Sequence, residues 1–226
     1  MGLEAGIIVM DAMEFFQRSA GRWRSQRTTH HLAFRRSEVG ESEIQVDALA
    51  ADDPQILALC EFHQIDSTQA SGGCRVSWGG SMGWDKEGEN HEGMTVFALV
   101  PDADNPRQGR LLRDRGYAEI VPVVGQYHMD EDGGLVLITE YDTMSSEERF
   151  WFASPDLRMR SSIVKRFGGF STASFCTESR IGSNLESEKE AHPVAVASGD
   201  VTPAKAQEVL KAKQDASRQY FSFLGW

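Results

Sequence analysis

The 226-residue chain lacks an excess of basic residues, since 23 Lys and Arg stand against 34 Asp and Glu and give a net charge of −11 at neutral pH. Nucleic acids and anionic membrane surfaces bind positive patches, so this balance argues against both partners. No apolar run approaches the ~20 residues of a membrane span, and the chain starts without the basic residue of a secretory signal. We therefore expect a cytoplasmic protein that contacts neither nucleic acid nor membrane.

Cysteine is scarce, and histidine shows no metal-ligand spacing. Cys60, Cys74 and Cys176 form an odd, widely spaced set, which fits free buried thiols in a reducing compartment better than a disulfide framework. The adjacent His30 and His31 would point to opposite faces of a strand and could not chelate one metal together. No metal site is predicted.

Hydrophobic periodicity predicts a mainly β protein. A short amphipathic helix is expected over residues 11–20, with Asp11 as its N-cap, and a second over 53–64, where Asp53 and Pro54 make a typical helix start. Short strands broken by Gly, Pro, Asn and Asp are expected at 22–35, 41–51, 74–84, 94–101, 109–113, 117–128, 135–142, 148–153, 157–164 and 170–181. About ten strands at this spacing indicate an all-β sandwich or barrel.

The composition changes after Gly182. Residues 183–200 are small and polar, as in a linker, and a Thr-Pro pair then starts a predicted helix over 202–217. Residues 183–226 hold six acidic and five basic residues, so the negative charge belongs to the preceding part of the chain. We expect a β domain over 1–182, followed by a linker and a C-terminal helical tail.

A short motif narrows the fold. Gly21-Arg22-Trp23 lies between the first predicted helix and strand, and it matches the Gly-x-Trp of lipocalin-like barrels. In those barrels the Trp plugs the closed end and an Arg near the end of the last strand packs across it. Arg180 stands where that partner should be. This predicts a lipocalin-like (calycin) antiparallel barrel of about ten strands with an N-terminal helix against it, a fold that holds one small ligand in its mouth.

Residues 147–160, EERFWFASPDLRMR, form two strand-like runs around a Ser-Pro-Asp turn. Arg158 and Arg160 recur at period two, which places both guanidinium groups on one face of a strand. If that face points into the protein it needs an anionic partner, because unpaired buried cations are costly. The segment therefore predicts a pocket for a large flat ligand that carries acid groups.

Several longer strings resemble the CpcS/CpeS-type phycobilin lyases of cyanobacteria and related algae, over about three quarters of the chain. They are 19–27 (SAGRWRSQR), 30–34 (HHLAF), 105–112 (NPRQGRLL), 116–119 (GYAE), 145–155 (SSEERFWFASP), 157–160 (LRMR) and 166–171 (RFGGFS). The resemblance implies an enzyme that binds a linear tetrapyrrole and attaches it by a thioether bond to a cysteine of an apo-phycobiliprotein α or β subunit. The phycobilin, phycocyanobilin or phycoerythrobilin, would be a transferred ligand, with no permanently bound cofactor.

The resemblance also implies catalytic roles. A phycobilin is a flat conjugated chain of four pyrrole-type rings with two propionates and an ethylidene group on one end ring. Arg158 and Arg160 would pair with the propionates or orient the ligand, since a guanidinium fork suits a carboxylate. Glu148 would hydrogen-bond the pyrrole nitrogens and keep the bilin protonated, which makes the ethylidene more electrophilic.

Aromatic side chains would complete the pocket. The expected bilin-binding residues are Trp84, Phe150, Trp151 and Phe152, which would stack on the rings, with His30 and Arg149 as further members. Trp84 shares its strand parity with Trp78 and Met82, which fits either an ordinary core face or a pocket wall.

The turn decides whether Glu148 shares the pocket. A two-residue loop, 155–156, would put Glu148 on the face opposite to the arginines. A three-residue loop, 154–156, would set Phe152 opposite Arg158 and bring Glu148 to the arginine face. We expect the three-residue loop, because the proposed acid and arginines must converge.

Two rival classes remain. One is a plain lipocalin-like carrier that sequesters an apolar or acidic ligand without transferring it. The other is a regulatory or partner subunit of a heteromeric lyase. The expected protein partners, besides the acceptor subunit, are a second copy of this chain or a related lyase subunit.

Overall fold

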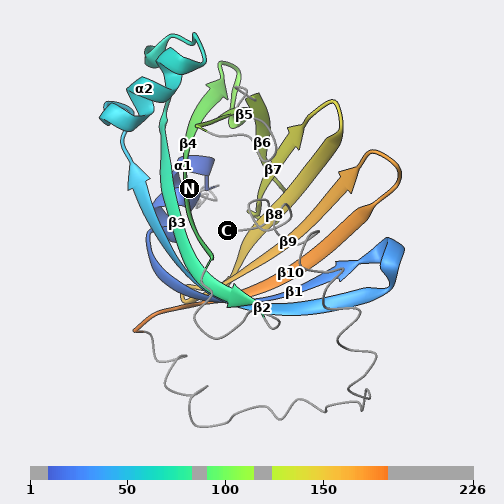
Figure 1. Ribbon diagram of the computed structural model, residues 1–226. Helices are drawn as coiled ribbons and strands as arrows, with labels where there is room; N and C mark the ends of the chain where they lie inside the picture. The colour runs from blue at the N-terminus through green and yellow to red at the C-terminus, as the bar shows by residue number, and fades with distance from the viewer. Residues whose placement is uncertain (1–9, 83–90, 115–123, 183–226) are drawn as a thin grey trace, which may run out of the picture.

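A computed structural model describes residues 10–82, 91–114 and 124–182 (Figure 1). Within these residues, ten antiparallel strands follow one another around a closed barrel, and β10 pairs with β1 to complete it. The strands are β1 Gly21–His31, β2 Arg36–Leu49, β3 Gly72–Met82, β4 His91–Asp102, β5 Asn105–Arg113, β6 Val124–Met129, β7 Leu135–Glu140, β8 Met144–Ser154, β9 Leu157–Arg166 and β10 Ser171–Arg180. The predicted ten-strand barrel is confirmed, while the predicted tail helix lies outside the described residues.

Helix α1, Ala12–Ser19, lies against one end of the barrel, which we call the closed end. Asp11 caps the helix as predicted, in a capping box where its carboxylate accepts from the Glu14 N–H and the Glu14 carboxylate accepts from the Asp11 N–H. Ala12, Phe15, Phe16 and Ser19 are its buried side chains. Phe15 contacts Phe152 of β8 with ring centroids 5.0 Å apart, so the helix forms the floor of the barrel.

Trp23 and Arg180 join this floor to the barrel wall. Trp23 is fully buried, and its indole N–H donates to the Ser19 carbonyl at the end of α1. The Arg180 guanidinium lies 4.2 Å from the Trp23 ring and donates to the Arg18 and Ala20 carbonyls. These carbonyls lie where helical hydrogen bonding runs out, so Arg180 satisfies the helix end and holds it on the barrel. The predicted Trp–Arg pairing is confirmed.

Helix α2, Pro54–Phe62, packs on the outside of the barrel. Asp53 caps it and Pro54 occupies its first turn, as the sequence predicts. Its buried side chains, Ile56, Leu59 and Cys60, form a second apolar cluster with Ala70 and with outward-facing residues of β2, β4 and β5. The strand residues are Leu49, Val96, Ala98, Val100 and Leu112. The first cluster fills the barrel interior near α1. The described helices include none that is both long and apolar enough to cross a membrane.

The first strand is shorter than predicted. β1 ends at His31 because Leu32–Phe34 form a 3₁₀ turn, η1, and Arg35 adopts the left-handed conformation with φ 50°. This hairpin turn and the turn between β9 and β10 lie at the end of the barrel opposite α1, which we call the far end (Figure 1).

Candidate functional site

The β8–β9 hairpin has a two-residue turn, Pro155–Asp156, and a bulge at Ala153. Ser154 pairs with Leu157 across the turn, and the register then shifts so that Phe152 pairs with Arg158. The expected register is therefore correct, but the expected three-residue loop is wrong. The extra residue, Ala153, lies in strand β8 as a bulge and not in the loop. The pairing of Phe152 with Arg158 is the same in both cases.

This register turns the proposed acid and arginines to the same side of the sheet. Glu148, Phe150, Arg158 and Arg160 are all buried and face the barrel interior, at 6%, 2%, 2% and 4% exposure. Phe152 shares their face and packs against the interior cluster. Five of the expected site residues thus form one inner wall.

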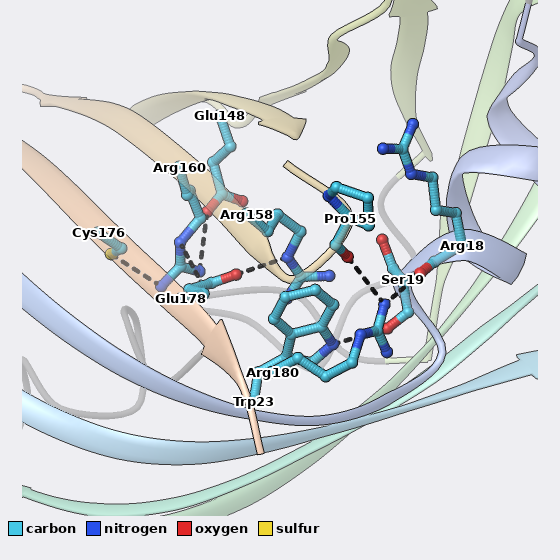
Figure 2. Close-up of polar contacts among 10 residues, drawn as sticks. All are labelled: Arg18, Ser19, Trp23, Glu148, Pro155, Arg158, Arg160, Cys176, Glu178 and Arg180. Carbon is cyan, nitrogen blue, oxygen red and sulfur yellow. Dashed lines mark hydrogen bonds and ion pairs between the residues drawn. The ribbon is translucent and has the colours of Figure 1, made fainter. Parts of the chain in front are cut away.

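Strand β10, which pairs with β9, supplies a carboxylate and a thiol as partners for Arg158 and Arg160 (Figure 2). Arg158 pairs across the ladder with Glu178, and its Nε donates to Glu178 Oε2 at 2.6 Å. Arg160 lies opposite Cys176 and donates to its Sγ through Nη2 at 3.3 Å. Arg160 also lies 3.7 Å from a Glu178 oxygen and 3.8 Å from a Glu148 oxygen. Glu178 is completely buried, so the wall contains an internal charge network.

Positive charge predominates in this network. Arg27 of β1 lies opposite Cys176, which adds a third guanidinium to Arg158 and Arg160 against the carboxylates of Glu148 and Glu178. Burial lowers the pKa of Arg27, and the charge of Arg160 lowers it further. Burial also acts to lower the pKa of Arg160, but Cys176, Glu178 and Glu148 outweigh it and the pKa lies above its ordinary value. Because arginine side chains stay protonated at neutral pH in proteins, the wall presents an excess of positive charge.

One buried donor points to a missing acceptor. Within the part of the chain that the structure describes, the Nη2 atom of Arg158 is buried and has no hydrogen-bond partner. Leaving such a donor unsatisfied costs roughly 1–3 kcal/mol, and more for a charged group. An acid group of a ligand would satisfy it, so the wall suits an anion.

The Arg158 guanidinium also connects this wall to the floor of the barrel. It lies 4.8 Å from the Trp23 ring, which Arg180 contacts as well. It lies 5.9 Å from the Phe150 ring, and Arg160 lies 5.6 Å from the same ring. The arginines are thus held by aromatic faces in addition to carboxylates, which fixes the direction of their guanidinium forks.

The interior becomes more polar toward the far end. Ser162 and Ser174 share a hydrogen bond of 2.7 Å, and Thr29, Thr139 and Ser146 are also buried. Arg113 faces the interior from β5, where its guanidinium lies 4.6 Å from the Phe97 ring. An apolar floor below a polar, cationic chamber fits an amphipathic ligand with an apolar body and acid groups.

Three expected pocket residues lie on the outer face instead. Trp151 and Arg149 alternate with the inward residues of β8, so they point away from the chamber. Arg149 donates to Asp130 at 2.6 Å and stacks 4.8 Å from Trp151, whose ring contacts Phe175. These contacts serve the outer surface, and we leave both residues out of the proposed pocket.

His30 is exposed on the outer face of β1. The adjacent His31 has the inward parity, and it bonds Glu38 of β2 at 2.5 Å. Of the two adjacent histidines, His31 and not His30 therefore faces the barrel interior. Trp84 lies outside the described residues.

Strand parity could have found the residues that the sequence expectations missed. The Gly-x-Trp motif places Trp23 and its partner Arg180 at the closed end of the barrel. Glu178 and Cys176 share the strand parity of Arg180, and Arg27 shares that of Trp23. A period-two count from those anchors leads to the missed groups. Arg113 had no such anchor, because its strand contains no motif that fixes which face is inside. In the described ranges, no cluster of three or more His, Cys, Asp or Glu could hold a metal.

Fold and site together define a ligand-binding up-and-down β-barrel with a cationic inner wall. The chain belongs to the CpeS-like protein family, whose model matches residues 11–181. It is 66% identical over 182 residues to chromophore lyase CpcS/CpeS 2 of Trichodesmium erythraeum, covering 80% of this chain and 93% of that protein. It is 60% identical over 192 residues to the phycocyanobilin lyase subunit CpcS of Picosynechococcus, covering 84% and 97%.

A solved structure agrees with the fold. The S-type phycobiliprotein lyase CPES from Guillardia theta superposes with a TM-score of 0.68 and 44% identity, covering 77% of this chain and 95% of that one. The lipocalin-like barrel expected from the Gly-x-Trp motif is confirmed, and the expected family is confirmed with it.

Proposed function

We propose that this protein is a phycobiliprotein chromophore lyase, which binds a linear tetrapyrrole in the barrel and attaches it through a thioether to a cysteine of a phycobiliprotein subunit. Similarity to named lyases supports the activity. The observation that carries the binding mode is the buried, unsatisfied Nη2 of Arg158 beside Arg160. The activity belongs to the β domain, residues 1–182.

The propionates are the groups that the wall selects. One propionate accepts from the Arg158 Nη2 atom and the other pairs with Arg160 or Arg27, because the wall holds three guanidinium groups and two carboxylates among its described residues. A bilin with two propionates and a protonated ring system has a net charge of about −1, so its binding brings the local charge from about +1 to about zero. The charged groups of the wall and ligand then neutralise each other almost completely, which a buried site requires.

The chemical step is an addition that needs no oxidant or reductant. The acceptor cysteine loses its thiol proton and its thiolate sulfur forms a C–S bond to the ethylidene carbon. The electron pair of the ethylidene double bond moves to the ring carbon, and that carbon takes one proton, so the proton count is unchanged. The protein therefore has to position the bilin and keep it electrophilic. Glu148 performs the second task by accepting hydrogen bonds from the pyrrole N–H groups, because a nearby carboxylate stabilises the protonated, cationic ring system.

Phe150 and Phe152 provide the apolar contact on the same wall. The arginines hold the acid groups and the phenylalanines hold the ring system, so the ligand has one orientation. Cys176 contacts Arg160 and is buried, and it serves as a hydrogen-bond acceptor in the network. The nucleophile comes from the acceptor subunit.

A transfer assay tests the activity. The full chain is incubated with phycocyanobilin or phycoerythrobilin and with apo-phycobiliprotein α and β subunits, and the mixture is denatured in acid urea. A lyase yields a covalent fluorescent adduct on the acceptor, and comparison of the two bilins identifies the preferred ligand. A dissociable coloured complex alone would show a carrier instead. Because one relative is named as a lyase subunit, an adduct formed only with a related chain would identify a heteromeric enzyme.

The role of Glu148 has a matched control in the neighbouring residue. Glu147 is exposed on the outer face of the same strand, so Glu147→Gln removes the same charge outside the barrel. We expect Glu148→Gln to lower the transfer rate at saturating bilin by roughly 10²-fold, in the range of a lost acid–base group, and Glu147→Gln to leave it unchanged. Equal rates for the two variants would remove Glu148 from the mechanism.

A further inference from the structure

Two hairpin tips at the far end of the barrel present exposed apolar side chains, three of them aromatic. Leu32 and Phe34 of η1 are 56% and 60% exposed, and Phe167 and Phe170 of the β9–β10 turn are 85% and 48% exposed. Phe34 and Phe170 stack on each other, with ring centroids 5.7 Å apart and an interplanar angle of 20°. We call these four residues, with Arg35, Arg36 and Lys165, the rim patch.

The patch is ordered although it is exposed. The Phe167 N–H donates to the Thr143 carbonyl at 2.7 Å, and the Arg166 N–H donates to the Phe170 carbonyl at 2.9 Å, so the β9–β10 tip is fixed against the neighbouring turn. On the other tip, Arg35 holds a left-handed conformation that costs a non-glycine residue on the order of 1 kcal/mol. A stacked, exposed aromatic pair beside a strained residue is typical of an interaction surface rather than of a solvated loop.

The patch is also basic in an acidic protein. Residues 32–36, LAFRR, and 165–170, KRFGGF, carry two basic residues each and no acid, while the chain as a whole has a net charge of −11. Among the described residues, the acids nearest these tips include Glu38, which pairs with His31, and Asp142 of the adjacent β7–β8 turn. The chemistry therefore fits a protein surface that combines acidic groups with apolar side chains.

The position of the patch points to its occupant. At the closed end, α1, Phe15 and Trp23 fill the barrel, so a ligand held by Arg158 and Arg160 is accessible from the far end. The tips that carry the patch are the turns of β1–β2 and β9–β10, which lie next to each other there (Figure 1). Any protein whose cysteine reaches the ligand through the far end must contact these tips.

We propose that the rim patch is the docking surface for the acceptor subunit, which binds it through an acidic face with apolar residues at its centre. This inference rests on the proposed lyase activity and deepens it, because it assigns the second substrate its own binding site. Phe34 and Phe170 form the apolar centre, and Arg35, Arg36 and Lys165 form the basic border.

The test separates acceptor binding from bilin binding. Initial transfer rates are measured against acceptor concentration for the Phe34→Ser/Phe170→Ser variant at saturating bilin, and the bilin Kd is measured by absorbance. We expect the acceptor KM to rise at least about tenfold, as for loss of a hot-spot pair, with the bilin Kd within about twofold of wild type. Phe62→Ser is the control, because Phe62 is 49% exposed on α2, away from the far end.

A charge variant gives an independent readout. Arg36→Glu/Lys165→Glu should also raise the acceptor KM, and it should flatten the dependence of that KM on salt, because exposed charges act through screened attraction.

An unchanged acceptor KM in both variants would overturn the docking proposal while leaving the lyase activity standing. A changed oligomeric state by light scattering with an unchanged KM would instead assign the patch to contact between copies of this chain. If the wild-type chain transfers no bilin, the proposed function fails. Binding of the apo-phycobiliprotein subunits to wild-type and variant chains by biolayer interferometry then tests docking directly, and equal binding overturns it.

Discussion

Arg158 has a structural partner and a proposed ligand at the same time. Its Nε donates to Glu178, and both side chains are almost completely removed from water, at 2% and 0% exposure. Replacing Arg158 alone removes the hydrogen-bonded partner of a fully buried carboxylate and leaves Glu178 beside the more distant Arg160, 3.7 Å away, which is a costly change in a core. Weaker bilin binding by Arg158→Ala alone could therefore reflect either a lost ligand contact or a destabilised fold.

A double-mutant cycle with Glu178 separates the contribution of Arg158 to stability from its contribution to bilin binding. We expect Arg158→Met to destabilise the fold by roughly 3–5 kcal/mol and Arg158→Met/Glu178→Met to recover a large part of that loss, because the double variant also removes the buried carboxylate that lost its hydrogen-bond donor. Urea unfolding measures both. The folded double variant should bind bilin at least about tenfold more weakly than wild type, since it lacks the donor for a propionate.

The control for this cycle is Arg110→Ala, because Arg110 is exposed on the outer face and bonds Gln69. Its unfolding free energy should stay within about 0.5 kcal/mol of wild type. Wild-type bilin affinity in the double variant would contradict the propionate assignment.

At the level of residues, the sequence predicted the arginine face well because period two is a strong signal. Arg158 and Arg160 had to share a face, and Glu148 followed once the register was chosen. The same rule separates Trp151 and Arg149 from that face, and the family resemblance of the whole string masked this. A string shared by relatives identifies a strand, whereas only the alternation within the strand identifies the pocket.

At the level of elements, the β8–β9 bulge sets the site. Without the extra residue at Ala153, a two-residue turn would move Glu148, Phe150 and Phe152 to the outside of the barrel. The sequence predicted that one more residue was needed but placed it in the turn. Loop and bulge give the same pairing further along the strands, so period two alone could not distinguish them.

Deleting Ala153 tests the bulge. We expect the variant either to slip its β8 register by one residue, which removes bilin binding, or to strain the turn, which lowers the unfolding midpoint. Absorbance of added bilin and urea unfolding measure the two effects. Ala153→Ser keeps the chain length and should behave as wild type, since Ala153 is exposed. A deletion variant with normal affinity and stability would show that the bulge does not set the site.

Strand positions were easier to predict than strand ends. All eight strand ranges expected after residue 70 overlap strands that the structure describes. The end of β1 was misplaced, because Leu32 and Phe34 look like the continuation of an alternating strand. Exposed aromatics in a turn break the usual link between hydrophobicity and burial, and here they form the rim patch.

At the level of the whole molecule, closure of the barrel joins the ends of the domain. β10 supplies Cys176 and Glu178 to the site and pairs with β1, which supplies Arg27 and Trp23. The site therefore exists only when the last strand has joined the first, so folding and ligand binding depend on the same pairing. The family match ends at residue 181, just after this strand.

This closure predicts the effect of removing residues 183–226. A chain that ends at Gly182 keeps β10 and the Arg180 contacts to α1, so we expect its bilin Kd within about twofold of wild type and its unfolding midpoint nearly unchanged. A chain that ends at Phe170 is the control: it lacks β10, opens the barrel between β1 and β9, and should not fold. Lost bilin binding in the longer chain, with its fold retained, would mean that the tail shapes the pocket. Retained binding would place the whole tetrapyrrole site within the barrel.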